Sequence, residues 1–158
     1  MINNYLEILE TSLQKKSAVL DEIMEYNKRQ EQLLKSEKVS MEDLDANMEQ
    51  KDELIQKLTD LDEGFETLYR RIKEQLSDNK DIYKVQIKRL QELISQITEK
   101  SVSVQAQEAR NKKLIENYFL KEKSQLRQGK KASKAAYGYY KSMNNSGAMS
   151  SQFMDQKK

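Results

Sequence analysis

The 158-residue sequence has no cysteine, histidine, proline or tryptophan, and it has only four glycines. The lack of cysteine excludes disulfides, thiol nucleophiles and most zinc sites, and the lack of histidine removes the commonest general base and transition-metal ligand. The 26 acidic residues are spread along the chain, which is typical of a solvated surface rather than of a catalytic carboxylate pair. We therefore expect a protein that is not an enzyme and that holds no cofactor and no metal.

Long apolar runs are also missing. No run approaches the ~18 residues that a membrane-spanning helix needs. The first residues do not form a signal peptide, because Glu7 and Glu10 already interrupt them in a helical pattern. We expect a cytoplasmic protein without stable membrane insertion.

What the sequence does contain is charge: 34% of its residues are charged and 37% are hydrophobic. With no proline and few glycines, this composition predicts an all-α fold of long helices. Residues 1–99 hold 15 basic and 22 acidic residues, a net charge of −7, whereas residues 100–158 hold 13 and 4, a net charge of +9. We expect the two parts to face different partners, or each other.

The strongest pattern is an apolar stripe over residues 40–76, with steps of three and four residues. Its members are Leu44, Met48, Ile55, Leu58, Leu61, Phe65, Leu68, Ile72 and Leu76. Similar stripes over 3–35 and 81–128, with short polar breaks between them, predict an antiparallel three-helix bundle over residues 1–128. Because the second break has no glycine or proline, one continuous helix remains the alternative there.

Polar residues interrupt the first stripe at Lys16, Asn27 and Gln30. We expect Lys16 and Gln30 to lie at the edge of the seam with their stems across it. A buried polar contact that fixes the register is the alternative. Gly64 weakens the second helix by ~1 kcal/mol relative to alanine; it either marks close packing against a neighbouring helix or has no structural role.

The third helix is longer than the second, so its distal part is predicted to project beyond the bundle or to pack on another molecule. Residues 129–158 hold three of the four glycines among serines and asparagines, and we predict a flexible C-terminal tail there. Six residues of this tail share one helical face: Ala132, Ala135, Ala136, Tyr139, Tyr140 and Met143. Such a stripe around Gly138 is typical of a segment that folds when a partner covers it.

Two other functions stay open on the residues alone. Lysines and arginines between 110 and 134, with aromatic residues nearby, form a basic arm that suits nucleic acid or an anionic membrane surface. The stripe over 40–76 could instead join two identical chains into a structural homo-oligomeric coiled coil. Since residues 1–99 are acidic, we expect no nucleic acid partner, and we expect a monomer or a homodimer.

Four stretches carry a resemblance to a known family: YLEILETSLQKKSAVLDEI, QKDELIQKLTDLDEGFETLYRRI, EARNKKLIENYF and the final AYGYYKSMNNSGAMSSQFMDQKK. Together they cover nearly the full length, and the chain resembles the FlgN-type flagellar export chaperones. That family often has two asparagines three residues apart in its third helix, where this chain has Glu108 and Asn111.

The resemblance implies a helical cytosolic chaperone of flagellar type III export. Such a protein binds hook–filament junction subunits and delivers them to the export apparatus. It also implies that the client contacts lie on the distal third helix and the tail. The residues expected there are Leu114, Tyr118, Phe119, Leu126, Tyr137, Tyr139, Tyr140 and Met143.

Overall fold

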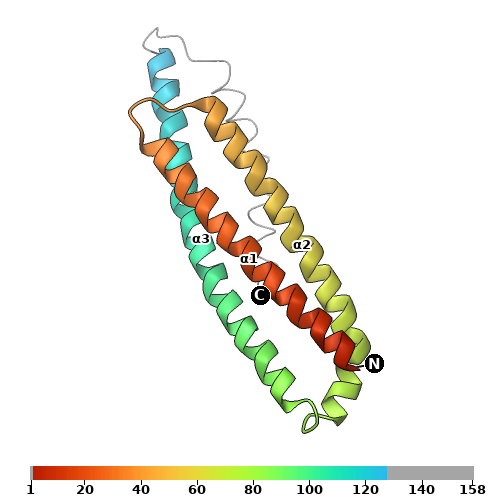
Figure 1. Cartoon of the computed structure of the whole chain (residues 1–158). Helices are drawn as coiled ribbons and strands as arrows, with labels where there is room; N and C mark the ends of the chain where they lie inside the picture. Colours follow the sequence, from red (N-terminus) through yellow and green to blue (C-terminus); the bar gives the residue numbers. More distant parts are fainter. Residues whose placement is uncertain (1, 128–158) are drawn as a thin grey trace. The chain divides into compact units, whose positions relative to one another are not determined.

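Three long helices make up the fold, as the sequence predicts. The computed structural model describes residues 2–127, and it contains α1 (Ile2–Lys35), α2 (Met41–Asp78) and α3 (Lys84–Arg127) (Figure 1). The predicted all-α fold is confirmed. None of the helices within residues 2–127 is both long enough and apolar enough to cross a membrane. The predicted tail, residues 129–158, lies outside the described residues.

Both connections between helices are short and are held by local hydrogen bonds. Ser40 begins α2, because its Oγ accepts the Asp43 backbone N–H at 3.3 Å and its carbonyl accepts that of Leu44 at 3.0 Å. A turn separates α2 from α3, so the continuous-helix alternative is wrong. The Asn79 carbonyl accepts the backbone N–H groups of Ile82 and Tyr83 and so holds the turn together. As a result α3 begins at Lys84, whereas the sequence predicts a start at about residue 81.

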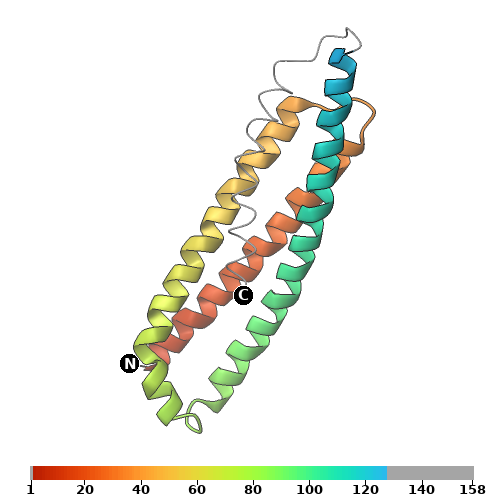
Figure 2. The same cartoon turned by 180° about the vertical axis from the view of Figure 1, so that it is seen from behind.

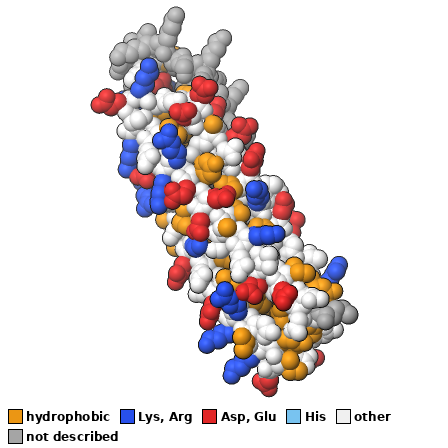
Figure 3. Space-filling view, in the orientation of Figure 1, with side chains coloured by type: hydrophobic (Ala, Val, Ile, Leu, Met, Phe, Trp, Pro, Cys, Tyr) orange, Lys and Arg blue, Asp and Glu red, His pale blue; other side chains and the backbone are white. Residues whose placement is uncertain are grey.

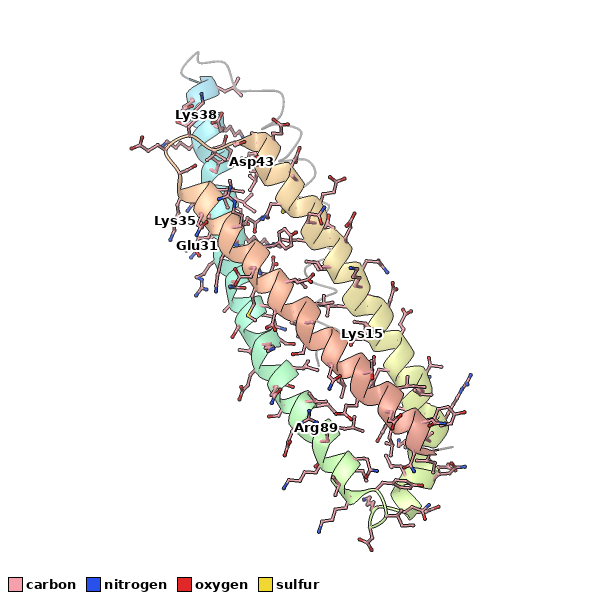
Figure 4. The ribbon with its side chains drawn as sticks, in the orientation of Figure 1. Lys15, Glu31, Lys35, Lys38, Asp43 and Arg89 are labelled. Atoms are coloured by element: carbon pink, nitrogen blue, oxygen red, sulfur yellow. The ribbon has the colours of Figure 1, made fainter. Side chains whose placement is uncertain are left out.

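The chain divides into two compact units, and each contains a segment of all three helices (Figures 1 and 2). Unit 1 comprises residues 1–23 and 53–103. Its core consists of leucines and isoleucines from the three segments, among which Leu9, Leu20 and Ile23 of α1 are fully buried. Arg89 of α3, labelled in Figure 4, binds Glu10 of α1 at 2.9 Å and adds a contact between the helices at the surface.

Unit 2 comprises residues 24–52 and 104–158, of which the structure describes those up to Arg127. Its apolar core includes Val104 of α3, which is fully buried, and a cluster of four buried residues: Leu33 of α1, Leu44 of α2, and Ile115 and Phe119 of α3. The prediction that distal α3 projects from the bundle is therefore wrong as far as Phe119. The seam of α3 continues through Ile115 and Phe119, and the α1–α2 hairpin reaches far enough to cover them.

Candidate functional site

The predicted client-binding residues of α3 differ in their exposure. Phe119 is buried in the unit 2 cluster, with 5% of its surface exposed, and Tyr118 packs against the same cluster. Their rings meet edge to face with centroids 5.4 Å apart. Leu114 is half-buried and Leu126 is 50% exposed. The structure thus brings Tyr118 and Phe119 together, with Phe119 inside unit 2 and Tyr118 half-buried at the edge of the cluster.

The other four predicted residues, Tyr137, Tyr139, Tyr140 and Met143, lie outside the described residues. Their assignment as client contacts remains a prediction.

Tyr118 is the titratable group of this cluster. Burial raises the pKa of its hydroxyl, and the neighbouring Glu122 raises it further through its charge and a hydrogen bond. Tyr118 therefore stays neutral and presents a hydroxyl donor at the edge of an apolar cluster.

A layer of polar side chains crosses the interior of unit 2 next to this cluster, and we call it the polar layer. Its members are Asn27 and Gln30 of α1, Asn47 and Lys51 of α2, and Gln107, Glu108 and Asn111 of α3. Five of the seven are buried, and Gln107 and Glu108 are half-buried. Burial of so many polar groups is costly unless they are paired.

Hydrogen bonds inside the polar layer connect all three helices. Asn111 donates to the Asn27 carbonyl at 2.8 Å and to Gln30 Oε1 at 3.0 Å. Lys51 donates to the same Gln30 oxygen at 3.1 Å, and its ammonium lies 2.8 Å from a carboxylate oxygen of Glu108. Gln30 thus joins one residue of α2 and one of α3 at a single atom. These bonds define which turns of the three helices meet.

The polar layer is not fully satisfied. Asn27 Oδ1 and Asn47 Oδ1 are buried and have no hydrogen-bond partner among the protein atoms described. Asp52, at the end of the layer, has a pKa raised by burial and by the charges of Glu108 and Glu49, against the opposing effect of Lys51. The closed arrangement of unit 2 therefore carries a polar penalty that a leucine layer would not have.

The prediction that Gln30 lies at the edge of the seam is wrong. Its side chain does not lie at the seam edge with its amide in water, but is 1% exposed and fully engaged in the polar layer. Lys16 comes closer to the expectation, since it pairs with Asp62 at 2.6 Å and stays partly exposed. The difference has a physical reason: Lys51 and Asn111 supply Gln30 with buried donors from the two other helices.

The surface around the polar layer is charged. At the end of α1, Lys35 binds Glu31 at 2.7 Å, and both are labelled in Figure 4. The hydrogen bond and the charge of Lys35 lower the pKa of Glu31, and Arg110 of α3 lowers it as well. Glu31 of α1 therefore lies close enough to Arg110 of α3 for their charges to interact across this edge.

A second feature, an open groove of ≈ 530 Å³, lies between α1 and α2 in unit 1. Its apolar lining includes Leu61, Phe65 and Leu68 of α2 and Ile8 of α1, which is 54% exposed. Figure 3 shows hydrophobic side chains at the surface near the start of α1. Lys15, labelled in Figure 4, also lines the groove. The middle of the long α2 stripe is thus only half-buried.

Gly64 lies in this groove, and the expectation of close packing there is wrong. A Cβ atom added at Gly64 would meet nothing within 4 Å. The glycine leaves open space beside the groove rather than allowing two helices to approach each other.

Gly64→Ala should therefore stabilise the protein. We expect the free energy of unfolding to rise by about 1 kcal/mol, because alanine is the better helix former and meets no obstacle. Urea denaturation of the full chain measures the change. A lower stability would show that the space at Gly64 is filled in solution.

The fold and these surfaces define an all-α protein built from three long amphipathic helices, with apolar faces that suit the binding of another protein. A family model described as FlgN protein matches residues 1–145. The chain belongs to the FlgN family, a family of flagellar export chaperones. No curated protein and no solved structure matches the chain.

Proposed function

We propose that this protein is a non-enzymatic chaperone of flagellar export that works in the cytoplasm. It binds hook–filament junction subunits and delivers them to the export apparatus. The observation that carries the proposal is the family match, which extends over 145 of the 158 residues. Long amphipathic helices with half-buried apolar residues support it, because such faces bind amphipathic segments of other proteins.

The client contacts are proposed on distal α3 and on the segment that follows it. Tyr139, Tyr140 and Met143 would be the anchors, since aromatic and methionine side chains contribute strongly to desolvated protein contacts. Leu126, half exposed near the end of α3, supports a binding surface that begins on the helix.

Capture from the lysate of the source cell tests the proposal. We expect the full chain to retain junction subunits, identified by mass spectrometry. The triple variant Tyr139→Ser, Tyr140→Ser, Met143→Ser should lose them while its thermal unfolding is unchanged. A matched control, Ser142→Ala, Ser146→Ala, Ser150→Ala, alters the same stretch and should retain them.

Two results would contradict the proposal. Recovery of the chain itself without any flagellar subunit would favour the homo-oligomeric coiled coil instead. Normal recovery by the triple serine variant would keep the chaperone function but refute the anchors.

A further inference from the structure

The α1–α2 hairpin of unit 2 carries an apolar surface that α3 covers. We call it the hairpin surface, and its residues are Leu33, Leu34, Val39, Met41, Leu44 and Met48. Ile115 and Phe119 of α3 pack on it, and Leu44 is fully buried in this cluster. Two of the six are methionines, whose flexible side chains adapt to different partners. The hairpin surface is therefore an apolar surface on which a helix already packs.

The helix that fills it shows which chemistry the surface accepts. We call residues 108–126 of α3 the covering segment. Asn111, Ile115 and Phe119 lie four residues apart on one helix face, so one turn after another an amide meets the polar layer, and an aliphatic and an aromatic residue enter the hairpin surface. Asn111 adds two hydrogen bonds to α1, at 2.8 and 3.0 Å.

The charges of the two partners are complementary. The hairpin, residues 24–52, holds eight acidic and five basic residues, a net charge of −3. The covering segment holds five basic and three acidic residues, a net charge of +2. A foreign helix with the same amide, aliphatic and aromatic spacing and a basic exposed face would find the same complementarity.

The polar layer makes the covering segment easier to displace than an apolar layer would. When α3 leaves, the donors and acceptors of the layer exchange their protein partners for water, so most of their hydrogen bonds are replaced. Asn27 Oδ1 and Asn47 Oδ1, which have no protein partner in the closed state, would gain water. The apolar contact that is lost, between Ile115 and Phe119 and the hairpin surface, would have to be replaced by apolar residues of the client helix.

We infer that the hairpin surface is a docking site for a basic amphipathic helix of the client, and that the covering segment occupies it as an internal substitute until the client displaces it. This inference rests on the proposed chaperone function and adds to it the place of docking and the chemistry of the client segment. It also gives Phe119 a different role, as a residue that competes with the client instead of contacting it.

The first experiment uses the full chain and a fluorescent synthetic peptide of residues 108–126 as the probe. The sequence has no native cysteine, so Asn27→Cys with Asn111→Cys allows a reductant-cleavable thiol crosslink between α1 and the covering segment. We expect the uncrosslinked variant to bind the peptide, the crosslinked one to bind at least about tenfold more weakly, and reduction to restore binding.

Two controls accompany it. Glu10→Cys with Arg89→Cys also joins α1 to α3, but in unit 1, and its crosslink should leave peptide binding unchanged. A peptide with Ile115→Asp and Phe119→Asp should not bind. Equal binding before and after crosslinking of the unit 2 pair, or no binding by the uncrosslinked protein, would overturn the inference.

A second measurement needs no substitution in the protein. Hydrogen exchange of the unmodified chain should accelerate at residues 112–119 when a ¹³C-labelled copy of the peptide is added, because displacement exposes these amides. Unchanged or slower exchange there would overturn the inference. A concentration-dependent dimer that competes with the peptide would show that a second copy, and not a client, is the occupant.

The peptide assays test the docking site without any client, whereas capture from lysate tests the chaperone function. If the protein captures junction subunits but fails the peptide assays, the proposed docking site is refuted and the chaperone function is not. If the protein binds the peptide but captures no junction subunit, the proposed chaperone function is refuted, and the covering segment is still shown to be exchangeable.

Discussion

Phe119→Ala is expected to lower the free energy of unfolding by about 3 kcal/mol. Truncation of a buried phenylalanine removes its transfer free energy and leaves a cavity. Phe119 is 5% exposed and packs with Leu33, Leu44 and Ile115, so few side chains are available to fill the space. Urea denaturation of the full chain, followed by circular dichroism, measures the loss.

The matched control is the next residue, Leu120→Ala. Leu120 is 64% exposed and lies about 100° around the helix from Phe119, so its truncation should change stability by no more than about 0.5 kcal/mol. Similar small effects of both substitutions would show that the unit 2 cluster is not packed in solution. Similar large effects would place Leu120 in a contact outside this chain.

The periodicity of the apolar residues was enough to predict the three helices and the start of α2. Ser40, the first residue of the range predicted for the second stripe, caps α2, since its hydroxyl accepts the Asp43 backbone N–H. The exact face was harder to predict. The stripe predicted for α2 includes Ile55, whereas the structure buries the adjacent Leu54. In a helix of more than thirty residues the 3.6-residue period drifts relative to a seven-residue repeat, and adjacent apolar residues cannot be distinguished.

The polar layer could not be predicted from a single helix. Asn27 and Gln30 interrupt the first stripe, and Gln30 looks like an edge residue when only α1 is considered. Their burial depends on residues that are distant in sequence: Gln107 pairs with Asn27, and Lys51 and Asn111 pair with Gln30. One sequence feature indicates the polar layer: polar residues interrupt the apolar stripe of each of the three helices in the segments that form unit 2.

The client-binding residues illustrate the same limit. Leu114, Tyr118, Phe119 and Leu126 are all apolar or aromatic residues of one helix, but the structure buries Phe119 and leaves Leu126 half exposed. Burial of Phe119 requires Leu33 and Leu44, which belong to the other two helices. A stripe on one helix therefore predicts that its residues will be covered, but not whether the same chain or a client covers them.

The second large effect is expected at the buried ion pair of the polar layer. Glu108→Ala should lower the free energy of unfolding by about 2–3 kcal/mol, because it leaves the Lys51 ammonium inside unit 2 without its carboxylate. The Lys51 side chain is 5% exposed, and Gln30 Oε1 would be its remaining partner. The expected loss of unfolding free energy is smaller than for a fully buried ion pair, because the Glu108 side chain is itself 21% exposed.

A double substitution and a surface pair complete this test. Lys51→Met with Glu108→Leu removes both charges and should recover most of the loss, because well-packed apolar residues often replace a buried ion pair without cost. Glu66→Ala breaks the exposed Arg70–Glu66 pair and should cost no more than about 0.5 kcal/mol. If Glu108→Ala costs as little as Glu66→Ala, water reaches Lys51 in the native state. The polar layer would then be open without a client, and α3 would be held on the hairpin by the Ile115 and Phe119 contacts alone.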